Sequence, residues 1–208
     1  MDKIINSTRL LEGIRYLAAK DKKLAEITAE YGPPPLWQRK EGFATLIRII
    51  LEQQVSLQSA KAAYDKLEKK VGQVTPDSFL SLGNEELKCI GFSRQKAGYW
   101  QNLAKAAKDG TLDFVALRNL PDNEVIKKLT TVKGIGPWTA NIYLLMALCR
   151  QDVWPDGDLA LELAAQKLYG LKNKPTPKKL LLMSKKWQPW RAVAARMLYH
   201  FYLNHGKN

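Results

Sequence analysis

The sequence predicts an all-α fold, and three observations lead to that prediction. Apolar residues recur at spacings of three and four, as in Phe43, Leu46, Ile47 and Ile50, which is the period of a helix with one buried face. Glycine and proline interrupt these runs, as they do at helix ends. The sequence contains no alternating run of β-branched residues, which is the pattern that would indicate a strand. The 208 residues suffice for one sizeable domain or for two small lobes that share a core.

The helical elements follow one another along the whole chain. The first is predicted over residues 8–20, and Gly32 to Pro35 form the clearest linker because glycine and proline break helices. Apolar stripes over residues 43–51 and 97–104 each predict a helix. Further helical patterns cover residues 56–71, 121–130, 138–149, 158–168, 176–186 and 190–204.

The composition favours a polyanionic partner. Hydrophobic residues make up 46% of the chain, so it can bury a core and need not be disordered. Lysine and arginine number 33 against 20 acidic residues, a net charge of +13, and such a surplus favours nucleic acid through counterion release. Residues 167–186 are markedly basic. A solvated helix face and a strip that faces DNA both fit this segment.

The cysteines and histidines are too few for common metal centres. Cys89 and Cys149 are the only cysteines, and His200 and His205 the only histidines. An iron–sulfur cluster requires four cysteines, and a zinc site is also disfavoured. We therefore expect two core thiols in a reducing cytosol. No long apolar stretch follows the N-terminus, so we expect neither a signal peptide nor a membrane span.

The sharpest local motif is Leu-Thr-Thr-Val-Lys-Gly-Ile-Gly-Pro-Trp-Thr-Ala at residues 129–140. Gly134 and Gly136 let the backbone turn tightly and approach a ligand closely. Pro137 suits the first turn of a helix, whose N–H groups and positive dipole end attract phosphate, and Lys133 adds charge. An ordinary helix–helix turn is the alternative. The motif resembles the helix-hairpin-helix element, which holds a DNA backbone, and this resemblance implies backbone contacts from Lys133, Gly134, Ile135, Gly136 and Thr139.

A candidate catalytic carboxylate follows this hairpin. Asp158 comes 20 residues after Trp138, an interval that predicts one helix of about four turns and a short loop, which would return Asp158 to the mouth of the helix. Asp158 also stands where an N-cap would, ahead of Leu159 and Leu161. Helix capping is therefore its alternative role, and Asp156 is its local rival.

The hairpin followed at this distance by an aspartate resembles the helix-hairpin-helix DNA glycosylase superfamily, and is most similar to its 3-methyladenine DNA glycosylase II branch. Residues 49–56, 91–97 and 187–192 also resemble segments of that branch, so the likeness covers about residues 33 to 204 in family order. It implies a central lobe at 36–151 with the hairpin at about 120–148. Residues 1–35 and 152–208 would form the other lobe, with the active site in the cleft between them.

The resemblance implies roles for individual residues. Asp158 falls at the catalytic aspartate, and Trp138 falls where lyase-competent relatives carry a nucleophilic lysine. Gln54 falls at the side chain that wedges into the minor groove, and Tyr199 at an aromatic residue of the base pocket. The carbonyls that hold a sodium or potassium ion in the family's hairpin correspond to those of Thr130, Val132 and Ile135.

Two departures from the family pattern bear on the substrate. Ile142 sits where a pocket tyrosine occurs in well-known bacterial members. The extra N-terminal β-rich domain of those members has no counterpart in this sequence. Substrate range is therefore less firmly predicted than reaction type.

The implied chemistry is hydrolysis of an N-glycosidic bond in double-stranded DNA. The enzyme flips the base out of the stack, and Asp158 stabilises the positive charge that develops on the sugar or orients the attacking water. Alkylated purines already carry positive charge, which an electron-rich wall of Trp138, Trp37 and Tyr199 would favour, although core packing is the alternative role for each ring. Without a lysine at position 138 we expect no strand scission.

Three other functions fit parts of the sequence. They are a glycosylase for uracil, mismatched adenine or oxidised guanine, a non-catalytic DNA-binding module on the same hairpin, and a basic helical adaptor between proteins. For the glycosylase we expect a monomer without an iron–sulfur cofactor, in the bacterial cytoplasm with the nucleoid or in a nucleus.

Overall fold

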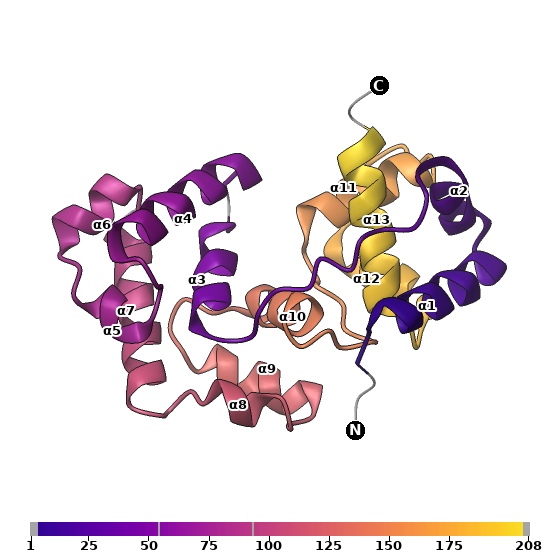
Figure 1. Cartoon of the computed structure of the whole chain (residues 1–208). Coiled ribbons are helices and arrows are strands. Elements are labelled where there is room, and N and C mark those ends of the chain that lie inside the picture. Colours follow the sequence, from indigo (N-terminus) through magenta and orange to yellow (C-terminus); the bar gives the residue numbers. More distant parts are fainter. Residues whose placement is uncertain (1–3, 54, 93, 206–208) are drawn as a thin grey trace. The chain divides into compact units, whose positions relative to one another are not determined.

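The computed structural model describes residues 4–53, 55–92 and 94–205, with the backbone alone for residues 94–96. These ranges contain helices and connecting segments (Figure 1), and β-pairing within them is limited to an isolated bridge between Ile4 and Arg150. The all-α prediction is confirmed. The chain forms two compact units, one of residues 39–143 and one of residues 1–38 together with 144–208.

The unit of residues 39–143 is built from helices that follow one another directly along the chain. In order they are α3 (Phe43–Leu51), α4 (Leu57–Val71), α5 (Pro76–Leu80), α6 (Asn84–Ile90), α7 (Arg94–Lys108), α8 (Phe114–Leu117), α9 (Asp122–Thr130) and the first part of α10 (Pro137–Met146).

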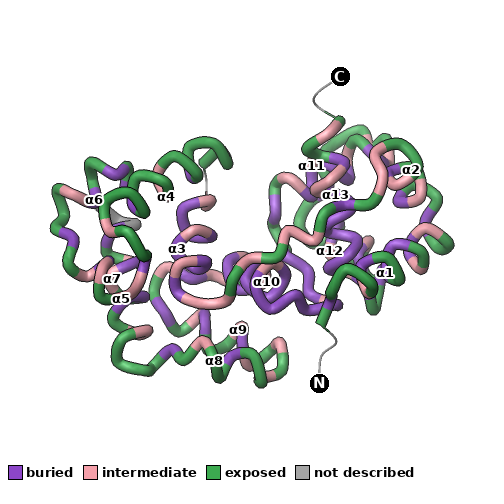
Figure 2. Tube along the Cα trace, in the orientation of Figure 1, coloured by how far each residue is buried: buried purple, intermediate pink, exposed green. Residues whose placement is uncertain are grey.

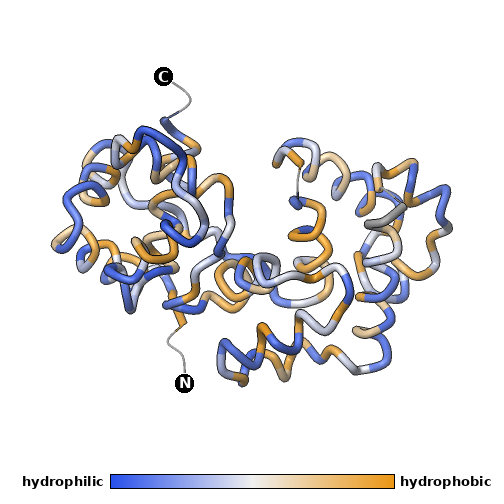
Figure 3. Tube along the Cα trace, turned by 180° about the vertical axis from the view of Figure 1, so that it is seen from behind, coloured by the Kyte–Doolittle hydropathy of each residue, from blue (hydrophilic) through white to orange (hydrophobic). Residues whose placement is uncertain are grey.

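The core of this unit is aromatic and aliphatic. Helix α3 is apolar over most of its length (Figure 3), and nearly all of its residues are buried. Phe79 lies at its centre, with ring centroids 6.0 Å from Phe43 and 5.6 Å from Trp100. These rings hold α3, α5 and α7 together, and burial of each ring stabilises the unit by about 1.5–3 kcal/mol.

The second unit joins the two ends of the described chain. Its helices are α1 (Ser7–Lys20), α2 (Lys22–Tyr31), α11 (Leu159–Leu168), α12 (Pro177–Ser184), the 3₁₀ turn η1 (Lys185–Trp187) and α13 (Arg191–His205). Helix α13 packs against α1, α2 and α11, so early and late segments lie together (Figure 1). Most residues of α13 are buried (Figure 2).

Asp21 ties several of these segments together. It caps α2 by accepting from the Lys23 amide, and its Oδ2 accepts from Tyr169 Oη at 2.6 Å and Trp187 Nε1 at 2.9 Å. Lys186 Nζ lies 2.8 Å from the same oxygen. Burial in itself raises the pKa of Asp21, but the hydrogen bonds from Lys186, Tyr169 and Trp187 outweigh burial and hold that pKa below its ordinary value of 3.8.

The long predicted helices are confirmed with small shifts at their ends, and the linker at Gly32–Pro35 is non-helical. Helices α2, α5, α6 and α8 correspond to none of the predicted helical segments. One predicted helix was too long, because α10 spans 137–146 rather than 138–149. It ends where Cys149 adopts a left-handed φ of +51° and the Arg150 amide bonds back to the Leu144 carbonyl at 2.9 Å. None of the described helices combines the length and apolar character needed to cross a membrane.

Candidate functional site

The predicted hairpin is present in the unit of residues 39–143. Helix α9 ends at Thr130 and α10 begins at Pro137, as its ring favours. Between them the Ile135 amide donates to the Val132 carbonyl at 3.0 Å, and Gly134 adopts a φ of +99°. Only glycine takes that backbone conformation without strain, so Gly134 sets the turn.

The two glycines of the hairpin have different surroundings. A Cβ on Gly134 would meet the Cβ and Cγ of Tyr99 at 2.4 Å, so Tyr99 on α7 packs directly against the turn. A Cβ on Gly136 would meet no described atom within 4 Å, outside its immediate neighbours. The space beside Gly136 is therefore where another backbone can approach, whereas Gly134 serves the fold.

The side chain of Gln53, two residues after the end of α3, contacts the hairpin. Gln53 Nε2 donates to Thr139 Oγ1 at 2.7 Å and lies 3.4 Å from the Gly134 carbonyl. Thr139 itself is 1% exposed, so its hydroxyl serves this internal contact. A contact from Thr139 to DNA would have to come from its backbone N–H, in the first turn of α10.

The other hairpin residues divide between core and surface. Lys133 is exposed, whereas Val132 and Ile135 are buried and anchor the turn through their side chains. The Val132 carbonyl accepts one hydrogen bond and keeps a second lone pair, as a carbonyl oxygen does. Carbonyl oxygens suit hard cations, so the donor set fits the monovalent ion expected there. That ion stays a prediction.

The candidate carboxylate lies in the other unit, at the start of α11. Asp158 caps the helix by accepting from the Leu161 amide through Oδ1 at 3.0 Å, which confirms the predicted N-cap. Its Oδ2 accepts from Tyr199 Oη at 2.8 Å. Asp158 is 7% exposed, whereas Asp156 is exposed. Two donors from different helices therefore fix the orientation of a largely buried carboxylate.

Trp37 belongs to the same unit as Asp158 and Tyr199. Its ring centroid lies 6.2 Å from that of His200, the residue that follows Tyr199 on α13. Trp37 has a φ of +49°, which is strained for a bulky residue. The neighbouring Leu36 carbonyl accepts from Arg196 Nε at 2.9 Å. Arg196 thus anchors the segment that carries Trp37.

Arg196 is fully buried and is satisfied by backbone carbonyls. Besides Leu36, it donates to the carbonyls of Ala192 at 3.1 Å and Leu145 at 2.5 Å. Burial lowers the pKa of Arg196 to about 10, so the side chain still carries its proton at neutral pH. Its three bonds join α13, the end of α10 and the linker before Trp37.

The remaining predicted residues are placed as follows. Trp138 lies partly exposed in the first turn of α10, and Ile142 is buried further along the same helix. Beside Ile142, burial raises the pKa of Tyr143 to about 12, and its hydroxyl accepts from the Gly42 amide at 2.9 Å. Gln54 lies outside the described residues, so its wedge role stays a prediction. The interlobe cleft and the exact lobe bounds also stay predictions.

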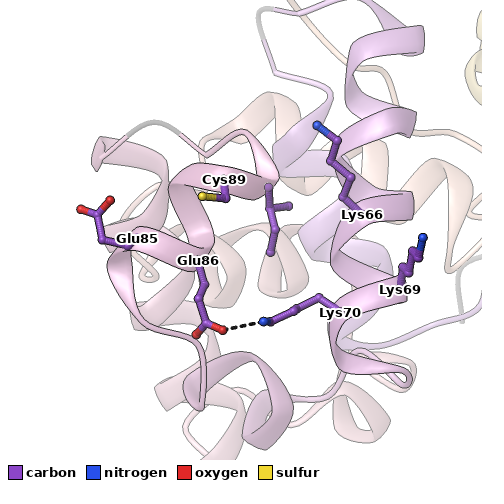
Figure 4. A pocket seen from close by; sticks show the side chains of 7 residues that line it. Lys66, Lys69, Lys70, Glu85, Glu86 and Cys89 are labelled. Carbon is purple, nitrogen blue, oxygen red and sulfur yellow. Dashed lines mark ion pairs between the residues drawn. The ribbon is translucent and has the colours of Figure 1, made fainter.

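One open pocket, of about 570 Å³, lies between α4 and α6 (Figure 4). It is lined by Lys66, Lys69, Lys70, Glu85, Glu86, Cys89 and Ile90, and contains none of the predicted site residues. Cys89 is exposed there and Cys149 is buried, so the prediction of two core thiols was wrong for Cys89. The buried residues of α6 are Leu87 and Ile90, and the helical period places Cys89 off the face that these two share. Within the described part of the chain, no three His, Cys, Asp or Glu side chains gather as metal ligands would.

Three residues that position the site were not predicted from the sequence. Gln53 precedes the residue assigned as the wedge, and a pair of amides at a helix end was the available signal. Arg196 interrupts an apolar stretch of α13, where a lone charge indicates an internal partner. Tyr99 gave no signal, because only the fold brings it to Gly134.

Comparisons with known proteins agree with this geometry. The family model described as HhH-GPD superfamily base excision DNA repair protein matches residues 47–189. Putative DNA-3-methyladenine glycosylase YfjP of Bacillus subtilis is 28% identical over 85% of this chain and 64% of its own length. DNA-3-methyladenine glycosylase 1 of Schizosaccharomyces pombe is 30% identical over 86% of this chain and 80% of its own.

A solved structure extends the likeness to three dimensions. The S. pombe 3-methyladenine DNA glycosylase Mag1, in complex with abasic DNA, superposes with a TM-score of 0.83 at 29% identity. The match covers 90% of this chain and 95% of that one. The chain thus spans slightly under two thirds of YfjP and nearly all of the Mag1 structure.

Proposed function

The chain belongs to the HhH-GPD superfamily of base excision DNA repair proteins, and we propose that it is a DNA N-glycosylase that releases alkylated purines from double-stranded DNA. The observation that carries this proposal is the buried Asp158 carboxylate at the start of α11, held by Leu161 and Tyr199. The names of relatives that match most of the chain, DNA-3-methyladenine glycosylases, support the substrate class.

The reaction that these residues would carry out is hydrolysis. A flipped nucleotide exposes its C1′–N bond. As that bond breaks, the base leaves with the bonding electrons and positive charge develops on the sugar. The Asp158 carboxylate, already oriented by its two donors, stabilises that charge without reorganising. Water then adds to C1′ and gives up a proton, which leaves a free base and an abasic site.

The hairpin would hold the DNA backbone without reading sequence. A phosphate at the start of α10 would meet the helix dipole, the early amides and the Lys133 ammonium. The space beside Gly136 allows the close approach that such a contact requires. Trp138, Trp37 and Tyr199 would offer aromatic faces to a cationic base, and Gln54 would fill the gap that the base leaves.

The product should distinguish a monofunctional enzyme from a lyase. Trp138 occupies the position of the lyase nucleophile and cannot form a Schiff base, so the DNA strand should stay intact until alkali cleaves the abasic site. We also place its action, as a monomer, in the compartment that holds the genome.

The test is to incubate the protein with methylated duplex DNA and to identify released bases by chromatography. We expect 3-methyladenine and 7-methylguanine, with unmethylated duplex as the blank and an Asp158→Asn variant as the catalytic control. A uracil-containing duplex in parallel tests another base specificity. Tight duplex binding with no base released from any substrate would mean that the protein is a non-catalytic DNA-binding module.

A further inference from the structure

The positive charge of the chain is concentrated at its C-terminal end. Residues 163–208 contain ten lysines and arginines and neither aspartate nor glutamate, since Glu162 is the last acidic residue. This part of the chain, less than a quarter of its length, therefore carries ten of the thirteen net charges. The hairpin lies outside it and does not account for this surplus.

Several of these cations have internal partners. Lys174 pairs with the buried Glu162, Lys186 with Asp21, and Arg191 with Asp152, while Arg196 is bound by carbonyls. Five others are exposed and form no ion pair within the described residues. We call them the lysine segment: Lys167, Lys172, Lys178, Lys179 and Lys185.

Two of these lysines oppose the stability of the helix that carries them. Helix α12 begins at Pro177, and Thr176 caps it by accepting from the Lys179 amide at 3.3 Å. Lys178 and Lys179 thus lie in the first turn, where the helix dipole disfavours cations by about 0.3–1 kcal/mol each. The turn contains no acidic residue to offset them. The stability of α12 therefore does not explain these charges, which indicates that they bind a ligand.

We propose that the lysine segment is a second contact surface for the phosphate backbone of duplex DNA, in addition to the hairpin. The proposal rests on the proposed function for its partner and extends the surface that holds that partner. Exposed lysines act as flexible point charges, which suit a row of phosphates and do not require a particular base sequence.

The chemistry of the segment favours DNA over protein or membrane. Lysine is depleted in protein–protein interfaces, where aromatic residues and arginine dominate. Membrane binding requires a broad apolar face on the helix, whereas the one strongly exposed large apolar residue of α12 is Leu182. The lysine segment is instead complementary in charge to a polyanion such as DNA.

The experiment compares two triple variants that lose the same charge. One is Lys172→Gln, Lys178→Gln and Lys179→Gln. The matched control is Lys22→Gln, Lys66→Gln and Lys105→Gln, whose lysines are also exposed and form no ion pair in the described structure. Affinity for undamaged duplex is measured from low to moderate salt, so the result does not depend on base release.

We expect the segment variant to lower the slope of log affinity against log salt by about 2–3, because each phosphate contact contributes about 0.9. Its affinity at about 0.1 M salt should fall at least about tenfold, and the control should change the slope by less than about 1. Its melting temperature should stay level or rise, since the dipole conflict is removed.

Three results would overturn the proposal. Equal slopes for the two variants would show that only total charge matters. A lower melting temperature in the segment variant alone would make these lysines structural. Equal or tighter binding of the wild type to polyglutamate or to anionic phosphatidylserine vesicles, at the same salt, would identify a different partner. If methylated DNA yields no free base while the slope changes as expected, only the proposed enzymatic activity fails.

Discussion

Asp158 caps a helix and is also the proposed catalytic carboxylate, so a single side chain would serve both roles. One oxygen caps α11 and the other accepts from Tyr199. A cap needs only a polar oxygen, which asparagine also supplies. Stabilisation of a sugar cation needs the negative charge, which asparagine lacks. The two roles can therefore be separated by a change that leaves the size and shape of the side chain almost unaltered.

We predict that Asp158→Asn lowers single-turnover base release at least about 100-fold, close to 3 kcal/mol of transition-state stabilisation. The melting temperature should change little, since the cap costs less than about 1 kcal/mol when asparagine replaces aspartate. Duplex affinity should hold or rise because a negative charge near the phosphates is lost. Asp156→Asn, at the exposed residue two positions earlier, should remain active. An active Asp158→Asn enzyme would reduce Asp158 to a cap.

At the residue scale, the sequence predicted what is local. The cap at Asp158 depends on a helix start that follows it directly, and the hairpin depends on consecutive residues. Tyr199 as partner of the site came from resemblance alone. Gln53 and Arg196 escaped prediction because their partners, Thr139 and Leu36, lie far along the chain and only the fold brings them together.

At the element scale, Gly134 and Gly136 of the hairpin have different surroundings, so an alanine at each position should have a different effect. Gly134→Ala places a Cβ against Tyr99 in a left-handed backbone, which should destabilise the protein by at least about 1 kcal/mol. Gly136→Ala meets no such contact and should melt like the wild type. It should nevertheless weaken duplex binding, because the added methyl group occupies the space through which a phosphate approaches.

These glycine variants are compared by thermal melting and by duplex titration. Wild-type affinity in Gly136→Ala would mean that no backbone comes close at that position, and the hairpin would then be an ordinary helix–helix turn. Unchanged stability in Gly134→Ala would show that the turn adapts to a side chain.

Helix length explains which elements the sequence revealed. The long helices repeat their apolar spacing over several turns, so their positions were predicted within a few residues. Helices α5, α6 and α8 span four to seven residues, which is fewer than two turns, and a period cannot be read from so little. Helix α2 is longer, but only Leu24 and Ile27 are buried on it, between charged residues.

At the scale of the whole molecule, Asp21 makes stability depend on pH. Its folded pKa is lowered, so the carboxylate contributes stability that is present above the unfolded pKa and is lost as pH falls through the folded pKa. We predict that the wild type loses melting temperature between about pH 5 and pH 3. Asp21→Asn should melt lower at neutral pH and show a flatter decline.

Parallel melting curves of the two proteins across this pH range check the prediction. Lys186→Gln serves as a partner control, because it removes the ion pair and keeps the bonds from Tyr169 and Trp187. Parallel decline of the wild type and Asp21→Asn would assign the acid sensitivity to other carboxylates.

The unit that holds Asp158 has a discontinuous chain, and this order matters while the protein is being synthesised. On the ribosome, α1 and α2 emerge well before their partners α11 and α13, with residues 39–143 between them. The middle unit can fold from contiguous chain as it emerges, whereas α1 and α2 can pack on each other but lack α13 until it is translated. A nascent chain therefore has its hairpin before its carboxylate site, and the site forms only when the last helix has left the exit tunnel.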